Sequence, residues 1–283
     1  MNSSPRTILV TGGNTGIGAA FAAAVARPGV HHVLACRSAE RAEAALQAAR
    51  AKGATASFLE LDLGDLAGAD RAARAFAREH GELDLLVDNA GLAGQHGTTT
   101  DGWELAFGVN HLGHFAFTLP LVPLVERARG SIVVVSSGSH YQAKAIRWGD
   151  LREPTKSATG MAEYEVSKVC NVLFAAELRR RHPSIGVVAV HPGRIASDIW
   201  RPIPWPVRAV LPKLLGMKSV EVGAQTLVRA AERARDPASA PLYLHELEPR
   251  APSALASDAA LAEELWSRSE AALSAALSFR AAA

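Results

Sequence analysis

A tyrosine and a lysine stand four residues apart in the helix-forming run Tyr164-Glu165-Val166-Ser167-Lys168. Side chains at this spacing lie on the same face of a helix. A free tyrosine has a pKa of about 10, and a neighbouring cation lowers that pKa because it favours the phenolate. Lowering the tyrosine pKa from about 10 to about 7 requires roughly 4 kcal/mol of added stabilisation of the phenolate, at about 1.36 kcal/mol per pKa unit. The pair therefore predicts an acid or base that works near neutral pH, although an ordinary packed tyrosine beside a solvated lysine has the same spacing.

A glycine-rich turn near the N-terminus provides a second chemical signal. The run 6–11 leads directly into Gly12-Gly13-Asn14-Thr15-Gly16-Ile17-Gly18, which precedes an alanine-rich helix. Glycines let the backbone turn tightly against a pyrophosphate, and the first amides of a helix attract an anion. The spacing Gly-x-x-x-Gly-x-Gly differs from the common dinucleotide fingerprint. The turn predicts a dinucleotide-binding loop, with a plain connector as the alternative.

Together these motifs resemble those of the short-chain dehydrogenases/reductases, whose cofactor motif is Thr-Gly-x-x-x-Gly-x-Gly and whose catalytic motif is Tyr-x-x-x-Lys. The resemblance covers about residues 6–247. Further family motifs follow in the expected order: Asp62, Asp88-Asn89-Ala90-Gly91, Asn110, Ser136-Ser137 and His191-Pro192-Gly193. The runs 34–38, 110–115 and 223–226 are similar to the retinol-dehydrogenase-like and protochlorophyllide-reductase-like branch. Asp88 departs from the family's usual Asn-Asn-Ala-Gly.

The resemblance implies a role for each matching residue. In the reducing direction Tyr164 would donate a proton to a carbonyl oxygen, and Ser137 would donate a hydrogen bond to the same oxygen. Lys168 would lower the pKa of Tyr164 and bind the nicotinamide ribose, while Asn110 would hold a water that relays protons to the lysine. The residues implied to bind the cofactor are Gly12, Asn14, Thr15, Gly16, Ile17, Gly18, Arg37, Ser38, Asp62, Leu63, Asn89, Ala90, Gly91, Tyr164, Lys168, Pro192 and Gly193.

The end of the second predicted strand indicates which dinucleotide is bound. NAD-preferring relatives usually place an acidic residue there, whereas this chain has Cys36 followed by Arg37. A guanidinium suits a 2′-phosphate through paired, charge-assisted hydrogen bonds. Ser38 either assists in this contact or only caps the next helix. We expect NADP(H) as the preferred cofactor, with NAD(H) as the alternative.

Predicted strands and helices alternate along the chain, as a doubly wound parallel α/β sheet requires. The predicted strands are 6–11, 31–37, 55–60, 83–88, 131–136, 185–190 and 241–244, and the clearest helices are 39–52, 65–79, 101–129 and 162–181. No linker divides the 283 residues. We expect one Rossmann-like domain, with a nucleotide-binding half (about 1–130), a catalytic and substrate half (about 131–250) and a C-terminal helix (about 254–276).

The segment 198–218 is too apolar for an ordinary loop, and it matches the position of the family's substrate-binding lid. Its Trp200 and Trp205 would cover a lipophilic carbonyl or alcohol substrate. The same residues could instead pack a short helix against the body, or contact a membrane or a partner. Ser139 and His140, close to Ser137, are further candidate substrate contacts. The insert between Ser137 and Tyr164 borders the pocket or forms a surface excursion.

Composition and charge argue against nucleic-acid binding and a membrane span. The formal charge is +2 and no lysine-arginine run stands out, so nucleic-acid binding has no electrostatic footprint. No apolar stretch approaches the roughly 20 residues that cross a bilayer, and the first strand begins too soon after Met1 for a signal peptide. We therefore expect a cytoplasmic protein without a transmembrane segment, with homo-oligomerisation left open. His111 and His114 have a helical spacing usable for a metal, but no thiol or carboxylate cluster completes it, so we expect none.

Two functions of other classes use the same residues. A reductase fold can be recruited to a non-redox cyclisation or elimination, and a dinucleotide-binding module can sense redox state without catalysis. The complete set of Asn110, Ser137, Tyr164 and Lys168 favours catalysis. We predict an NADP-dependent oxidoreductase that interconverts a lipophilic ketone or aldehyde and its alcohol by hydride transfer.

Overall fold

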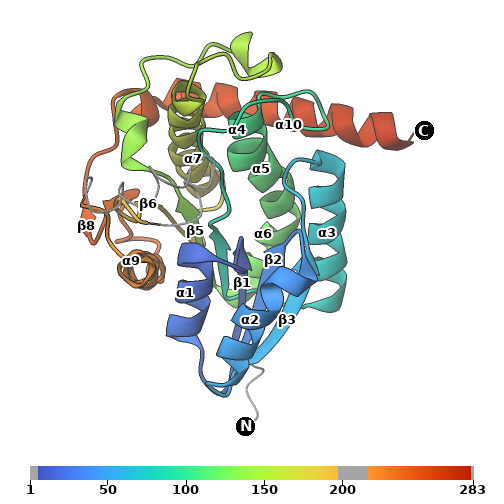
Figure 1. Ribbon diagram of the computed structural model, residues 1–283, viewed down its shortest axis with the longest axis vertical. Coiled ribbons are helices and arrows are strands. Elements are labelled where there is room, and N and C mark those ends of the chain that lie inside the picture. The colour runs from blue at the N-terminus through green and yellow to red at the C-terminus, as the bar shows by residue number, and fades with distance from the viewer. Residues whose placement is uncertain (1–5, 197–215, 282–283) are drawn as a thin grey trace.

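The computed structural model describes residues 6–196 and 216–281, so Trp200 and Trp205 lie outside the described residues. Its centre is one eight-stranded sheet of order β3-β2-β1-β4-β5-β6-β7-β8 (Figure 1). The strands are β1 (Arg6–Thr11), β2 (Val30–Cys36), β3 (Thr55–Glu60), β4 (Leu85–Asp88), β5 (Ser131–Val135), β6 (Gly186–His191), β7 (Tyr243–His245) and β8 (Glu248–Pro249). The predicted doubly wound α/β class is confirmed. The order reverses beside β1, and ligands of such sheets bind where it reverses.

All strand pairs are parallel except β7 and β8, a short antiparallel pair that the sequence did not predict. The central strands are buried on both faces, so they are continuous runs of β-branched and other aliphatic residues rather than alternating patterns. In register, Val10 of β1 lies between Leu34 of β2 and Val87 of β4. The carboxyl ends of these strands therefore meet at one edge of the sheet.

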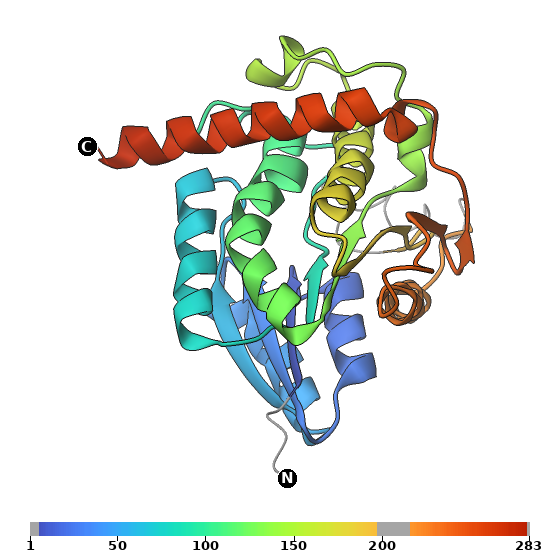
Figure 2. The ribbon, with the colours of Figure 1, turned by 180° about the vertical axis from the view of Figure 1, so that it is seen from behind.

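Helices cover both faces of the sheet. One face carries α1 (Gly16–Val25), α2 (Ala39–Arg50) and α9 (Val220–Arg233), and the other carries α3 (Leu66–Glu79), the helical run Leu105–Ala128 and α7 (Met161–Arg181) (Figures 1 and 2). The C-terminal α10 (Ala259–Ala281) crosses α7 and α3 on the outside of the second face. It begins later than predicted because Asp258 accepts a hydrogen bond from the Leu261 amide and so starts the helix there.

The predicted helix 101–129 begins at Leu105 and is not a uniform α-helix. It consists of α4 (Leu105–Phe107), a wider π-helical turn η1 (Gly108–Leu112), α5 (Gly113–Thr118), a 3₁₀ turn η2 (Leu119–Leu121) and α6 (Val122–Ala128). Asp101 does not start this run, because its carboxylate accepts the amide of Leu66 at the start of α3. Pro120 and Pro123 lack an amide hydrogen, and they stand at the starts of η2 and α6.

This same run corrects an expectation about membrane spans. Among the described residues, Leu105–Ala128 is long and apolar enough to cross a bilayer by length and composition alone, with a mean hydropathy of 1.3. The expectation that no apolar stretch approaches that length is therefore wrong. Most of the run is buried inside the protein, and Phe115, Phe117 and Leu121 are completely enclosed. Packing in the core accounts for its apolar composition.

The insert that precedes α7 is held by two carboxylates. Glu104, which is buried, accepts a hydrogen bond from the Thr155 hydroxyl at 2.5 Å. Glu163, in the first turn of α7, accepts the backbone amides of Lys156 and Ser157. These bonds tie the far end of the insert to the start of the catalytic helix and to the helical run beneath it.

Candidate active site

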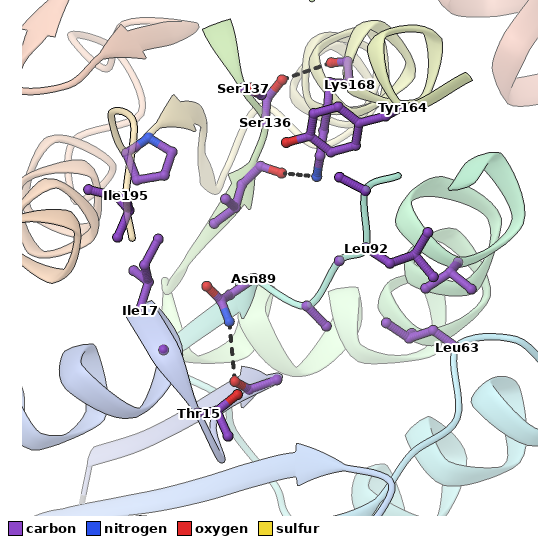
Figure 3. A pocket seen from close by; sticks show the side chains of 18 of the residues that line it. Thr15, Ile17, Leu63, Asn89, Leu92, Ser136, Ser137, Tyr164, Lys168 and Ile195 are labelled. Carbon is purple, nitrogen blue, oxygen red and sulfur yellow. Dashed lines mark hydrogen bonds between the residues drawn. The ribbon is translucent and has the colours of Figure 1, made fainter. Parts of the chain in front are cut away.

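A cleft of about 1210 Å³ opens at the carboxyl ends of the central strands, where the strand order reverses (Figure 3). It extends from the glycine turn after β1, past the ends of β4 and β5, to the turn after β7. The structure brings together most of the residues predicted for the site. Those that line the cleft are Gly12, Asn14, Thr15, Gly16, Ile17, Arg37, Ser38, Asp62, Leu63, Asn89, Ala90, Gly91, Ser137, Ser139, Tyr164, Lys168, Pro192 and Gly193.

The glycine turn has the geometry of an anion-binding loop. Gly12 and Gly16 have φ angles of 63° and 56°, in the left-handed region that glycine adopts without strain. Thr15 precedes α1 without a side-chain bond to the helix, so the first amides of α1 are not capped and lie at the cleft wall. Unpaired amides at a helix N-terminus suit a phosphate group. The residues present therefore fit a dinucleotide pyrophosphate.

Gly18 allows two backbone segments to pack closely and does not itself face the cleft. A Cβ atom at this position would lie 2.5 Å from the Gly12 carbonyl oxygen and 2.6 Å from Nδ2 of Asn89. Asn89 in turn donates from Nδ2 to the Thr11 carbonyl oxygen at 2.8 Å. The missing side chain of Gly18 thus allows the turn after β1 to rest against the residue that follows β4. Gly18 itself is not part of the cleft lining.

Two arginines that follow β2 in the chain line one end of the cleft. Arg37, predicted from the sequence, is joined by Arg41, which sequence reasoning missed. Ser38 accepts the amide of Arg41 at 3.2 Å and so caps α2, which holds the helix start beside the cleft. Both guanidinium groups are exposed, and neither has an ion-pair partner within the described part of the chain. The position of Arg41 in the first turn of the helix after β2 could have identified it.

Ser137, Tyr164 and Lys168 meet at the opposite wall of the cleft. Ser137 follows β5, and the other two lie one turn apart on the buried face of α7. The Ser137 side chain lies beside the Tyr164 hydroxyl, close enough to lower its pKa. Lys168 donates from Nζ to the Val135 carbonyl oxygen at 3.1 Å, and its Nζ lies 5.6 Å from the centre of the Tyr164 ring (Figure 3). Ser136 has a different role, since its hydroxyl bonds to the Lys168 carbonyl at 2.8 Å and anchors α7 to β5.

Burial sets the protonation of this pair. It raises the pKa of Tyr164, and the neighbouring Ser137 side chain only partly opposes that change. Burial also lowers the pKa of Lys168 to about 7. In this structure burial outweighs the lowering of the Tyr164 pKa that a charged Lys168 would cause, because both groups lose solvent and a partly neutral lysine exerts less charge. A tyrosine that stays protonated at neutral pH is suited to donate a proton.

Asn110 supports the catalytic wall from behind. It is fully buried in the π-helical turn and does not line the cleft. Its Oδ1 accepts the amide of Leu92 at 2.9 Å, and its Nδ2 donates to the Leu92 carbonyl and to Oγ of Ser167. Ser167 donates to the Tyr164 carbonyl at 2.7 Å. Through these bonds Asn110 joins the turn after β4 to the helix that carries the tyrosine.

His140 is not where the sequence interpretation expected it. Its side chain is completely buried outside the cleft lining, with Nδ1 2.7 Å from the Ser137 carbonyl oxygen and Nε2 accepting the amide of Ser253 at 3.1 Å. The 3₁₀ turn η3 (Gly138–Tyr141) turns His140 into the protein, so the prediction that it contacts the substrate is wrong. Ser139 does line the cleft.

Several polar residues at the cleft mouth had no signal in the sequence. Gln95 and Gln142 line it, as do Lys218 and Glu246, which form an ion pair with each other. Glu246 has a φ of 58°, an uncommon backbone conformation for a residue with a side chain. These residues come from four separate segments, and only the fold brings them together. Arg194, which is exposed, also lines the cleft.

The two histidines with metal-like spacing bond in different directions. Nε2 of His111 lies 2.8 Å from the Ser269 hydroxyl of α10, whereas Nε2 of His114 lies 2.9 Å from the Thr11 hydroxyl beside the cleft. Over residues 6–196 and 216–281, no three His, Cys, Asp or Glu side chains gather in an arrangement that could hold a metal. Cys36 and Cys170 are buried free thiols.

Comparison with known proteins agrees with this geometry. The short chain dehydrogenase family model matches residues 6–148, which include the glycine turn and Ser137. Human retinol dehydrogenase 13 is 35% identical over 286 residues, covering 93% of this chain and 83% of the relative. The chain belongs to the short-chain dehydrogenase/reductase family. Mouse retinol dehydrogenase 12 is 40% identical over 202 residues, covering 69% of this chain and 63% of the relative. The retinol-dehydrogenase-like character predicted from the sequence is confirmed.

Solved structures of this short-chain dehydrogenase/reductase fold superpose on most of the chain. An uncharacterised protein from Mycobacterium paratuberculosis has a TM-score of 0.74 at 30% identity, covering 96% of this chain and 94% of that chain. A short-chain dehydrogenase from Sphingobium yanoikuyae in complex with NADPH has a TM-score of 0.66 at 25% identity, covering 85% of this chain and 87% of that chain.

Proposed function

We propose that this protein is an NADP(H)-dependent oxidoreductase that interconverts a lipophilic ketone or aldehyde and its alcohol. One observation carries the proposal: Ser137, Tyr164 and Lys168 line the same cleft as an uncapped glycine-rich helix start. A proton donor and an anion-binding loop therefore face one shared space. Membership of a family of oxidoreductases supports the same reaction class.

The cofactor proposal rests on two positively charged features of the cleft, the start of α1 and the arginine pair after β2. The start of α1 would take the pyrophosphate, and Arg37 with Arg41 would take the 2′-phosphate of NADP(H) through charge-assisted hydrogen bonds. Asp62 would contact the adenine. Asn89 to Gly91, with Pro192 and Gly193, would border the nicotinamide. The NADPH carried by the Sphingobium yanoikuyae neighbour supports this choice over NAD(H).

The catalytic residues divide the remaining work. When bound, the cofactor supplies or accepts the hydride. In reduction Tyr164 donates its phenolic proton to the substrate oxygen, so negative charge does not accumulate there. The Ser137 hydroxyl donates a hydrogen bond to the same oxygen, and protonated Lys168 stabilises the tyrosinate that forms. Asn110 holds α7 in place through Ser167.

A lipophilic substrate is proposed from two sources. The relatives include proteins named retinol dehydrogenases. In addition, Leu92, Leu105 and Val109 add apolar surface to the cleft. We also propose that the protein acts in the cytoplasm as a single domain.

Consumption of NADPH and NADH over a panel of lipophilic ketones, aldehydes and quinones tests the proposal. We expect oxidation that prefers NADPH and falls by at least about 1,000-fold in Tyr164→Phe, a loss within the range of proton-donor contributions. Tyr243→Phe is the matched control, because that tyrosine is also buried and its hydroxyl has no hydrogen-bond partner among the described residues. Binding of NADPH by calorimetry without turnover of any carbonyl would contradict the redox proposal and favour a non-redox or sensing role.

A further inference from the structure

His114 lies one helical turn after Asn110, and both of its ring nitrogens are engaged. The side chain is only 2% exposed. Nδ1 lies 3.0 Å from the Asn110 carbonyl oxygen, and Nε2 lies 2.9 Å from the Thr11 hydroxyl. Burial lowers the pKa of His114 to about 3, so the ring is neutral at working pH. Neither the family motifs nor the proposed reaction assigns it a role.

The hydrogen bonds of His114 have a definite direction. A carbonyl oxygen only accepts, so Nδ1 must carry the proton and donate to Asn110. Nε2 of the neutral ring must then accept the hydroxyl proton of Thr11. The Thr11 oxygen is left to accept the backbone amides of Asn89 and Ala90, at 2.9 and 3.0 Å. The histidine thus completes an ordered chain of bonds from the end of β1 to the π-helical turn.

This chain of bonds connects the two walls of the cleft. At one end Thr11 fixes Asn89 and Ala90, which border the proposed nicotinamide site. At the other end Asn110 holds Ser167, and Ser167 bonds to the Tyr164 carbonyl. Gly91 closes the gap between the walls, since a Cβ there would lie 3.1 Å from Oδ1 of Asn110.

We propose that His114 is a positioning residue that sets the distance between the cofactor wall and the tyrosine wall of the active site. The inference rests on the proposed oxidoreductase function. Rate depends steeply on such distances, because a misplacement of about 1 Å can cost roughly 100-fold. Loss of both ring hydrogen bonds frees Thr11 and the Asn110 carbonyl to move independently, so the distance between the two walls is no longer fixed.

His111 provides a matched control on the same helical run. It is equally buried, burial also lowers its pKa to about 3, and it has one hydrogen bond through Nε2. That bond joins Ser269 on α10, on the side away from the cleft. His111→Phe therefore removes a buried histidine and a hydrogen bond without touching either wall.

The test compares His114→Phe, His114→Gln and His111→Phe. We expect His114→Phe to lower kcat at least about tenfold and to weaken NADPH binding several-fold, with an unchanged KM for the carbonyl. Gln can present an acceptor near the Nε2 position, so His114→Gln should recover part of the binding of NADPH. His111→Phe should lower thermal stability but keep both kinetic constants.

Two results would overturn the inference. One is a folded His114→Phe protein that keeps wild-type kcat and NADPH affinity, and the other is an equal loss of both in His111→Phe. If His114→Phe does not fold, His114→Gln and His114→Asn decide by the same comparison. An inactive wild-type protein would instead refute the proposed function. In that case the NADPH affinity of the same variants, measured by fluorescence, would still decide whether His114 positions the cofactor wall.

Discussion

The cofactor end of the cleft is built mainly from backbone, whereas its catalytic end is built from side chains. At the cofactor end, Gly12 and Gly16 turn the backbone with positive φ angles, and a single carbon added at Gly18 would collide with the Gly12 carbonyl and with Asn89. At the catalytic end, Tyr164 and Lys168 depend on burial, which moves the pKa of each. The first end should therefore be sensitive to added volume, and the second to pH and to changes of a single polar group.

Added volume at Gly18 should have the largest effect. Gly18→Val places atoms within 2.6 Å of the Gly12 carbonyl and of Asn89, so the turn must move away from the helix start. We expect NADPH affinity, measured by calorimetry, to fall at least about 100-fold. Gly81→Ala is the control, because a Cβ there meets nothing within 4 Å. Wild-type affinity in a folded Gly18→Val protein would show that the cofactor end does not depend on close backbone packing.

Removal of the two arginines should change cofactor choice rather than binding as a whole. Arg37→Ala with Arg41→Ala removes the proposed partners of the 2′-phosphate, each a charge-assisted interaction. We expect the ratio of kcat/KM for NADPH over NADH to fall roughly 10- to 100-fold. Arg78→Ala, at the exposed end of α3, should leave the ratio unchanged. An unchanged ratio in the double variant would refute the assignment of these arginines.

The catalytic end should respond to pH. Burial lowers the pKa of Lys168 to about 7, so the lysine is charged below that pH and loses its charge above it. The raised pKa keeps Tyr164 protonated over the same range. The kcat of carbonyl reduction should therefore decrease as pH rises through about 7, approaching tenfold per unit. Lys168→Arg, whose charge persists, should flatten the profile. A flat wild-type profile between about pH 6 and 9 would contradict this account.

Asp88 should affect stability and leave catalysis unchanged. Burial raises its pKa from 3.8 to about 7, and Oδ1 has no partner among the described residues. The unfolded chain ionises first, so the free energy of unfolding should drop between about pH 4 and 7, by on the order of 4 kcal/mol. Asp88→Asn should remove that decrease, which urea unfolding would measure. Equal stability of the two proteins at about pH 4 is the internal control, and an equal decrease in both would refute the assignment.

Most of the fold was predictable because local patterns and tertiary packing agree. The buried strands and the glycine turn have sequence signals that do not depend on distant residues. The start of the helical run Leu105–Ala128 has no such local signal. Asp101 could have begun that run, but its carboxylate instead accepts the amide of Leu66 at the start of α3. The wide turn around Asn110 also has no local signal.

The site was predictable where a motif carries the chemistry, and less so where only the fold assembles it. The spacing of Tyr164 and Lys168 correctly placed both on one helix face, but the pKa direction depends on burial that the sequence does not show. His140 was misplaced because closeness to Ser137 in the chain does not determine where a side chain points. Lys218 and Glu246 meet from segments far apart, and no pattern within either segment reports their contact.

Hydride transfer itself is the most direct test of the account. Wild-type protein is incubated with NADPH deuterated at C4 and a lipophilic ketone or aldehyde that it turns over, and the alcohol is analysed by mass spectrometry. The account predicts one deuterium on the carbinol carbon, and loss of labelled product in Tyr164→Phe while NADPH still binds. Product that forms without deuterium from either C4 face, or that Tyr164→Phe forms at the wild-type rate, would contradict it.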